Sequence, residues 1–132
     1  MRLGVKTSRR EELIDITSRV QALVDEAGFD SGAVLIFCPH TTAAVTINEN
    51  ADPDVSDDIV DGLARIAPRN ARWRHGEGNS DGHVKSTLVG PSLLVPVEGG
   101  RLALGTWQGV YFTEFDGPRD RRVVVTLLPG AG

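Results

Sequence analysis

Apolar residues recur along this chain with two periods, one typical of helices and one typical of strands. Between residues 17 and 28 the apolar positions fall three or four residues apart: Val20, Leu23, Val24 and Ala27. That spacing places them on one face of a helix. Thr17 is a favoured N-cap residue, and Gly28 suits the left-handed position after a helix C-terminus. The pattern therefore predicts a helix that opens at Thr17 and ends before Gly28.

A second helix is predicted after Asp52 and Pro53, a side-chain acceptor followed by a ring whose missing N–H costs nothing at the first helical position. One apolar face follows, and it consists of Val55, Ile59, Leu63 and Ile66. Pro68 ends this helix. Residues 81–89 favour a short third helix closed by Gly90, with a structured loop as the alternative.

Strands are predicted from short apolar or alternating runs between glycine and proline punctuation. The runs before the second helix are residues 13–16, 33–37 and 43–47, and those in the final third are 92–97, 101–104, 109–115 and 122–128. Turns between the later runs favour an antiparallel meander. The chain is expected to have an α+β fold, with mainly antiparallel β-sheets packed against two main helices and one short helix.

Length and composition predict a single compact domain over residues 1–132. The 132 residues are 40% hydrophobic and 24% charged, which suffices for a core and excludes wholesale disorder. The formal net charge is -4, and no basic stripe is evident, so nucleic acid is not an expected partner. No apolar run approaches a membrane span, and the single cysteine, Cys38, favours a reducing compartment, so a cytoplasmic location is expected.

Three histidines, His40, His75 and His83, lie in the middle of the chain beside small, hydroxyl or carboxylate residues. Imidazole suits zinc and related metals, and three such ligands with an open position make a catalytic metal site. Their spacing matches no established metal motif. Surface histidines, or histidines hydrogen-bonded in the core, are the alternative.

The most polar segment is residues 75–86, which contains three glycines. Glycine lets backbone N–H groups approach a ligand, and Lys85 and Ser86 stand beside a predicted helix start, so a phosphate site is one interpretation. A solvated loop is the other interpretation. The glycine spacing does not match a phosphate-binding Walker loop.

Residues 40–53 form a second polar constellation between a predicted strand and a helix start. Asn48, Glu49 and Asn50 stand where ligand contacts are common, although Asn48 and Asn50 could equally satisfy backbone groups in a turn. Trp107 and Gln108 are candidates for a pocket wall, with tryptophan in the core or at an interface as the alternative.

Charges are segregated along the second predicted helix and the segment after it. The acids come first, at Glu49, Asp52, Asp54, Asp57, Asp58 and Asp61, and the bases follow at Arg65, Arg69, Arg72 and Arg74. This order complements the helix dipole and needs no further function. The alternative is that the arginines cover an anionic substrate or the acidic face of a neighbouring subunit.

Several blocks closely resemble the YjbQ-like family, formerly an uncharacterised protein family and identified with secondary thiamine-phosphate synthase. The blocks are residues 40–55 (HTTAAVTINENADPDV), 77–86 (EGNSDGHVKS), 104–112 (LGTWQGVYF) and 114–119 (EFDGPR). They follow the family order and cover nearly the whole chain. Gly82 departs from the usual alanine, and Trp73 stands where tyrosine is common.

The resemblance implies an α+β domain, usually assembled as a homotrimer with sites near the subunit boundaries, and a small phosphorylated metabolite as ligand. It implies that His40, His75 and His83 share one pocket, which would be a metal or an anion site. The expected cofactor is a divalent metal, zinc or magnesium, and no organic cofactor is evident. The activity it implies joins a pyrimidine pyrophosphate to a thiazole phosphate, giving thiamine phosphate and pyrophosphate.

Roles follow from the chemistry of that reaction, in which the departing pyrophosphate needs cationic donors. Lys85 and Arg119 are expected to contact phosphate, and Glu77 or Asp81 to act as base or to complete a metal shell. The expected substrate-binding residues are Thr41, Asn48, Asn50, Asn79, Ser86, Gln108 and Arg119. Two alternatives stay open: a metal-dependent hydrolase of a phosphorylated metabolite, and a noncatalytic ligand-binding oligomer.

Overall fold

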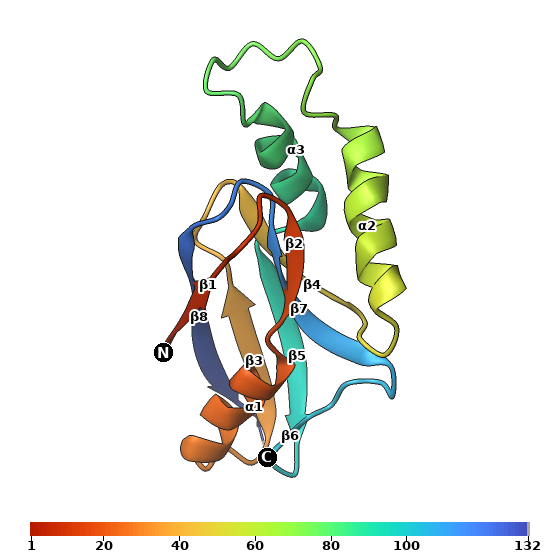
Figure 1. The fold of residues 1–132 in the computed structure, drawn as a ribbon. Helices are drawn as coiled ribbons and strands as arrows, with labels where there is room; N and C mark the ends of the chain where they lie inside the picture. The colour runs from red at the N-terminus through yellow and green to blue at the C-terminus, as the bar shows by residue number, and fades with distance from the viewer. Residues whose placement is uncertain (132) are drawn as a thin grey trace.

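Two antiparallel sheets share one hydrophobic core in this computed structural model, which describes residues 1–131 (Figure 1). The larger sheet has the order β1 (Arg2–Lys6), β8 (Asp120–Pro129), β3 (Gly32–Phe37), β5 (Ser92–Glu98) and β6 (Arg101–Leu102). The smaller sheet has the order β2 (Glu12–Asp15), β7 (Gln108–Glu114) and β4 (Ala43–Glu49). The α+β prediction is confirmed.

Alternation along the strands places one face of each sheet in the core. On β3, Val34 and Ile36 are fully buried, and β5 contributes Val95 and Val97 to the same side. The smaller sheet supplies Phe112 from β7, which is also fully buried. Because side chains alternate along a strand, the residues between these positions face outward from the larger sheet.

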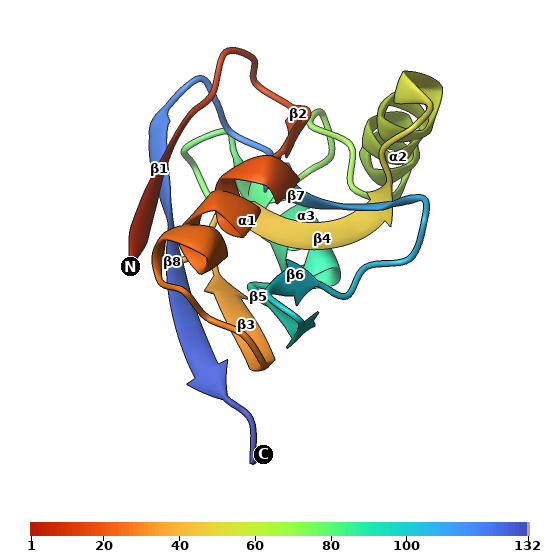
Figure 2. The same ribbon diagram turned by 90° about the horizontal axis from the view of Figure 1, so that it is seen from below.

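Helix α1 (Thr17–Glu26) and helix α3 (Ser80–Val89) lie toward opposite ends of the two sheets (Figures 1 and 2). Helix α1 begins at Thr17 as predicted, but its N-cap is Ile16, and the Thr17 N–H donates to Asp15 Oδ1 at 2.9 Å. Gly28 has a φ of 61°, which confirms the left-handed position expected after this helix.

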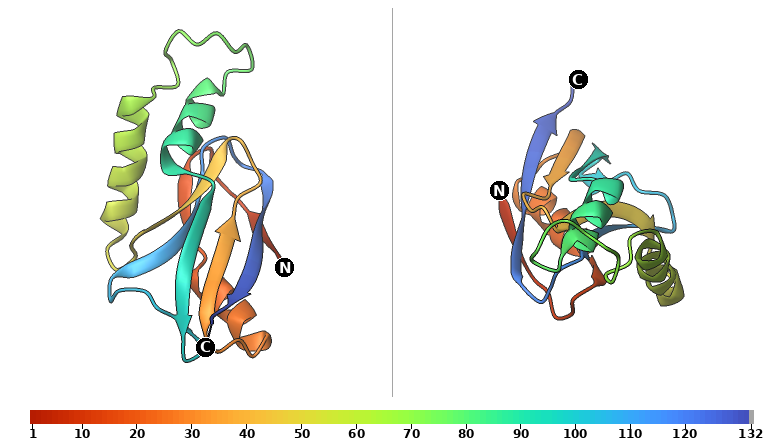
Figure 3. Two further views of the ribbon diagram at one scale, coloured as in Figure 1. Left: turned by 180° about the vertical axis from the view of Figure 1, so that it is seen from behind. Right: turned by 90° about the horizontal axis from the view of Figure 1, so that it is seen from above.

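Helix α2 (Pro53–Ile66) stands beside the body of the molecule, against β2 (Figures 1 and 3). Its predicted start is confirmed, because Asp52 is the N-cap and its Oδ1 accepts the Asp54 N–H at 2.9 Å. The apolar residues of its inner face are only half-buried, and Ile66 is exposed, so no residue of α2 is fully buried.

Residues 80–89 form a helix rather than a structured loop, and Gly90 follows it as predicted. The helix lies against the ends of β4 and β7, where a side chain at Gly82 would place its Cβ 3.0 Å from the Phe115 carbonyl oxygen. A bare glycine therefore allows this close approach.

The predicted meander is wrong. Strand β7 pairs with β2 and β4 in the smaller sheet, whereas β8 crosses to the larger sheet and inserts between β1 and β3. The predicted strand at residues 101–104 is shorter, and a first strand, β1, was not expected in the polar N-terminal segment. Its buried Leu3 and Val5 alternate with polar residues or glycine. None of the helices in residues 1–131 has the length and apolar character needed to cross a membrane.

Candidate functional site

The three histidines line one polar cavity of about 450 Å³. His40 comes from the loop between β3 and β4, His75 from the segment between α2 and α3, and His83 from the first turns of α3. The structure therefore brings together the three side chains that the sequence grouped. This cavity lies at the end of the sheets that carries α3, because His83 and Asn79 at the start of that helix are among its lining residues.

His40 is held by the backbone of β8. Its Nε2 accepts the N–H of Arg122 at 3.0 Å. Burial lowers the pKa of His40 below its usual value, and the positive charge of Arg121 lowers it further. The ring is therefore neutral at pH 7, with its proton on Nδ1, because Nε2 uses its lone pair as an acceptor.

His75 and His83 form an edge-to-face pair with ring centroids 5.4 Å apart and an interplanar angle of 88°. His75 is exposed, and its Nε2 lies 3.7 Å from the carboxylate of Glu77. Both rings and Glu77 border the cavity. The pair consequently forms a wall in which each ring restricts the orientation of the other.

Arg121 lines the cavity and belongs to a buried ion pair. Arg121 Nε donates to Glu114 Oε1 at 2.9 Å, and Arg121 Nη2 donates to Thr42 Oγ1 at 2.9 Å. Thr7 Oγ1 completes the arrangement by donating to the same Glu114 carboxylate at 2.7 Å. The Glu114 side chain is fully buried and the Arg121 side chain is 6% exposed. The guanidinium of Arg121 is therefore fixed at the cavity surface.

Arg119 and Asn79 meet at the carboxylate of Asp116. Arg119 Nη2 and Asn79 Nδ2 each donate to Asp116 Oδ2 at 2.9 Å. All three residues line the cavity, and the Arg119 side chain is 53% exposed, so its guanidinium can still approach a bound anion. Two predicted ligand contacts, Arg119 and Asn79, are thus placed together.

The formal charges around the cavity cancel while the histidines are neutral. Two arginines, Arg119 and Arg121, face two carboxylates, Glu77 and Asp116. The cavity is therefore polar, and its lining offers both donors and acceptors of hydrogen bonds.

Asp81 and Lys85 do not reach this cavity. Asp81 is fully buried, and Lys85 Nζ donates to its Oδ2 at 2.9 Å. Arg10 Nη2 donates to Asp81 Oδ1 at 2.9 Å, while Glu11 accepts from Lys85. This cluster fastens the loop between β1 and β2 to α3. The structure gives both residues a place in a buried ion network, away from the predicted phosphate contact.

The remaining predicted contacts divide into two groups. Thr41 lines the cavity, and Ser86 lies in an adjoining hollow, where its Oγ donates to the Thr41 carbonyl at 2.6 Å. The others are absent from the cavity lining. Their side chains make local hydrogen bonds: Asn48 Oδ1 accepts from the Glu49 N–H, Asn50 Nδ2 donates to Asp15, and Gln108 Oε1 accepts from the Gly105 N–H.

Residues that sequence reasoning missed include Thr42, Glu114, Asp116 and Arg121. A signal for Arg121 is present in the strand period, because it shares the inward parity of Val123 and Val125 on β8. A charged residue at an inward position needs a buried partner or a cavity. Here it has both.

The histidines do not fit a shared metal centre in this arrangement. Within residues 1–131, no three histidine, cysteine, aspartate or glutamate side chains lie close enough together to hold a metal ion. The Nε2 lone pair of His40 is already used, and its Nδ1 carries the proton in the neutral ring. The zinc or magnesium expected from the sequence stays a prediction.

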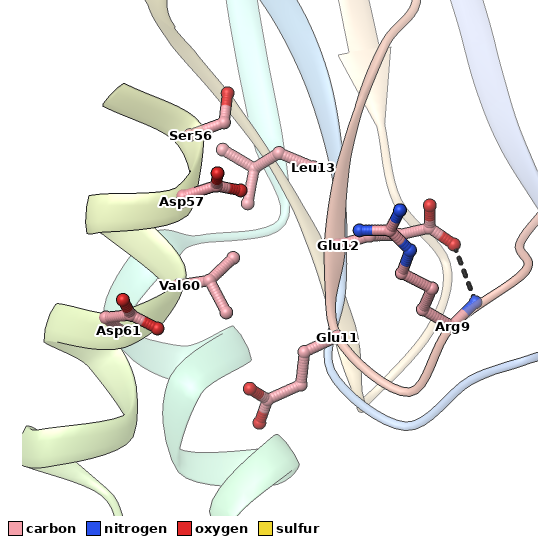
Figure 4. Close-up of a pocket in the computed structure, with 8 residues that line it drawn as sticks. All are labelled: Arg9, Glu11, Glu12, Leu13, Ser56, Asp57, Val60 and Asp61. Carbon is pink, nitrogen blue, oxygen red and sulfur yellow. Dashed lines mark hydrogen bonds between the residues drawn. The ribbon is translucent and has the colours of Figure 1, made fainter. Parts of the chain in front are cut away.

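A separate hollow, which lies between β2 and α2, is acidic (Figure 4). Leu13 and Val60 point into it from the two sides, and the carboxylates around it belong to Glu11, Glu12, Asp57 and Asp61. Arg9 is the one basic side chain among the described lining residues. Such a surface repels phosphate at pH 7, which leaves the histidine-lined cavity as the better candidate.

Together the fold and the cavity define a small α+β domain of two antiparallel sheets whose histidines gather in one polar hollow. The family model described as UPF0047 protein YjbQ-like matches residues 1–130, and the chain belongs to that family.

Its relatives come from both bacteria and archaea. The UPF0047 protein YugU of Bacillus subtilis is 54% identical over 127 residues, which cover 96% of each chain. A UPF0047 protein of Archaeoglobus fulgidus is 45% identical over 130 residues, which cover 97% of this chain and 100% of that protein.

Solved structures show the same fold. An uncharacterised conserved protein of the YjbQ/UPF0047 family from Clostridium acetobutylicum has a TM-score of 0.95 at 52% identity, covering 97% of this chain and 99% of that one. A conserved hypothetical protein from Thermus thermophilus has a TM-score of 0.91 at 47% identity, with coverage of 97% and 99%. The sequence-based family assignment is confirmed.

Proposed function

We propose that this protein is a transferase that binds phosphorylated metabolites in the histidine-lined cavity and joins a pyrimidine pyrophosphate to a thiazole phosphate. The observation that carries the proposal is the meeting of His40, His75 and His83 with Arg119 and Arg121 in one cavity. Guanidinium and imidazole donors around a polar hollow suit the phosphate groups of both reactants.

The reaction breaks the carbon–oxygen bond to pyrophosphate and forms a carbon–nitrogen bond to the thiazole ring. Pyrophosphate leaves with the electron pair, so its new negative charge needs stabilisation. Arg119 is the reachable cation for that charge, and the fixed Arg121 guanidinium adds a second positive charge at the cavity surface. Both are already oriented by carboxylates, which reduces the reorganisation needed in the reaction.

The histidine wall supplies proton transfer. His83 and His75 border the same space, and Glu77 lies beside His75 Nε2. A protonated imidazole there donates to a phosphate oxygen of the leaving group, and a neutral imidazole accepts a proton from a reacting water. The second role supports a hydrolase of a small phosphorylated metabolite as the other candidate, carried by the pairing of His75 with Glu77.

Assembly and location belong to the same proposal. A homotrimer is supported by the outer face of the larger sheet, where Phe37, Leu94 and Leu128 are exposed. A cytoplasmic location is supported by Cys38, which is buried as a free thiol.

Product analysis separates the candidates. Purified protein is incubated with the two phosphorylated reactants, with and without magnesium, and thiamine phosphate and pyrophosphate are measured by mass spectrometry. Elemental analysis of the same sample gives its metal content. The transferase makes thiamine phosphate only when both reactants are present. A hydrolase releases phosphate from one reactant alone, and that result would overturn the transferase proposal.

Matched variants assign the activity to the cavity. Arg119→Gln and His83→Gln should each lower kcat/KM by about tenfold to a thousandfold, as loss of one charge-stabilising donor does elsewhere. Arg65→Gln removes an exposed arginine from the last turn of α2 and serves as the control. Equal activity in all three variants would place the chemistry elsewhere. Saturable pyrophosphate binding without any product would identify a noncatalytic binding protein.

A further inference from the structure

A cavity distinct from the histidine-lined cavity also borders the His75 and His83 pair. Its volume is about 520 Å³, and we name it the Trp73 chamber after the ring in its wall. The chamber is lined by Arg72, Trp73, Arg74, Ser80 and Val84, together with His75 and His83, which also line the histidine-lined cavity. Two hollows of similar volume therefore share one wall made of two imidazole rings.

The chamber combines an apolar part with free positive charge. Trp73 and Val84 provide apolar surface, and the tryptophan is held in place because its Nε1 donates to the Pro68 carbonyl at 3.0 Å. Arg72 and Arg74 are exposed, and neither forms an ion pair with another residue in the described part of the chain. Arginines without carboxylate partners contrast with the paired arginines of the first cavity.

This arrangement is not required by the fold. Arg72, Trp73 and Arg74 lie in the segment between α2 and α3, outside every helix and strand, and contribute nothing to the hydrophobic core. A tryptophan side chain that is neither core nor strand material, set between two unpaired arginines, favours recognition of a ring by stacking and of an anion by guanidinium groups.

We propose that the Trp73 chamber is a second ligand subsite, which takes a planar ring that carries a phosphate or similar anionic group. Because the chamber and the histidine-lined cavity share His75 and His83, such a ligand lies next to whatever occupies that cavity. The further assignment of this ligand as the second substrate rests on the proposed transferase function, whereas the binding of a ring-bearing anion does not.

Direct binding tests the subsite without any assay of turnover. The chain has two tryptophans, so Trp107→Phe leaves Trp73 as the only one, and its fluorescence reports on the chamber. Phenylphosphonate is the probe, and methylphosphonate carries the same charge without the ring. We expect phenylphosphonate to change the Trp73 emission saturably and to bind at least about tenfold more tightly than methylphosphonate, because only the phenyl ring stacks.

Variants locate the binding. The double variant Arg72→Gln with Arg74→Gln should weaken phenylphosphonate binding by about tenfold or more. Trp73→Leu, whose binding is measured by calorimetry because the fluorescent ring is gone, should weaken it by a similar factor. The control combines Arg65→Gln with Arg69→Gln, which removes two charges from the same region outside the chamber lining. Pyrophosphate binding, measured by calorimetry, should change by less than about twofold in all these variants, because it belongs to the first cavity.

The outcomes separate this proposal from the function proposed above. Equal affinity for the two phosphonates, or binding that survives the double arginine variant and Trp73→Leu, overturns the subsite. Phenylphosphonate binding that is lost in those variants supports it, even if pyrophosphate does not bind and the transferase proposal fails. Pyrophosphate binding with no ring-dependent phosphonate binding overturns the subsite and leaves the transferase proposal standing.

Discussion

Lys85 follows Asp81 by one helical turn on α3, and its ammonium donates to the Asp81 carboxylate at 2.9 Å where neither side chain reaches solvent. Arg10 and Glu11, from a loop more than 70 residues earlier, complete the cluster. A charge pair in this setting costs desolvation free energy and is tolerated because each group has a partner. Removal of Lys85 leaves two carboxylates, Asp81 and Glu11, to share the single cation Arg10.

Lys85→Met should therefore lower the free energy of unfolding by about 3 to 5 kcal/mol, the usual cost of breaking a buried ion pair. Urea denaturation followed by circular dichroism measures it. Lys6→Met, on an exposed position of β1, is the control and should change stability by less than about 0.5 kcal/mol. If the Lys85→Met protein is as stable as the native protein but no longer binds pyrophosphate, Lys85 has a role in binding and not in stability.

Acid should weaken the same cluster. Burial opposes ionisation of Asp81, but hydrogen bonds from Arg10 and Lys85 outweigh burial and lower its pKa to about 2. Aspartate in an unfolded chain has a pKa of about 3.9, so the stabilisation is complete above that value and is lost as the pH falls toward 2. The difference amounts to about 2 to 3 kcal/mol. Urea midpoints measured from pH 6 to pH 2.5 should fall more steeply in the native protein than in Asp81→Asn.

His40 should contribute a second pH dependence at higher pH. Its lowered pKa means that the unfolded chain binds a proton more readily than the folded protein. Stability is therefore lost as the pH falls through about 6.5, the ordinary histidine value, and the loss continues down to the pKa of the folded state. His40→Gln keeps an acceptor for the Arg122 N–H without the titration. The variant should show a smaller loss of stability between pH 7.5 and pH 5, and an equal loss would contradict the assignment.

The outer face of the larger sheet should carry the subunit contact. Leu94 is 62% exposed on β5, beside exposed Phe37 on β3. Light scattering should give three times the chain mass of 14.2 kDa for the native protein and a smaller assembly for Leu94→Glu. Leu88→Glu, an exposed apolar position on α3, is the control and should leave the mass unchanged. A native protein that is monomeric would remove the trimer from the proposal.

Local signals in the sequence predicted the elements well, because their causes are local. The cap formed by Asp52 and Pro53, and the left-handed Gly28, each depend on a few neighbouring residues. Strand pairing depends on distant residues, which is why the crossing of β8 into the larger sheet escaped prediction. Neither β7 nor β8 differs in pattern from strands of a meander, although they belong to different sheets.

The candidate site was predicted in part for the same reason. The histidines were recognisable by residue type, and the cavity does contain all three. The burial of Asp81 and Lys85 was not recognisable, since their partner Arg10 is 71 residues from Asp81 and charged side chains are ordinarily exposed. The sequence showed which side chains could bind a ligand, but it did not show that Asp81 and Lys85 bind other residues of the same chain instead.

Helix α2 has no fully buried side chain, although it is the longest helix in the described chain. Its inner face makes only half-buried contacts, and elements with few buried apolar contacts open locally at a lower free energy than a packed core. The segment after α2 holds Trp73 and His75, so the walls of both cavities include residues that follow the one described helix without a fully buried side chain. Any ligand that bridges those walls to α3 contributes its own binding free energy to the order of that region.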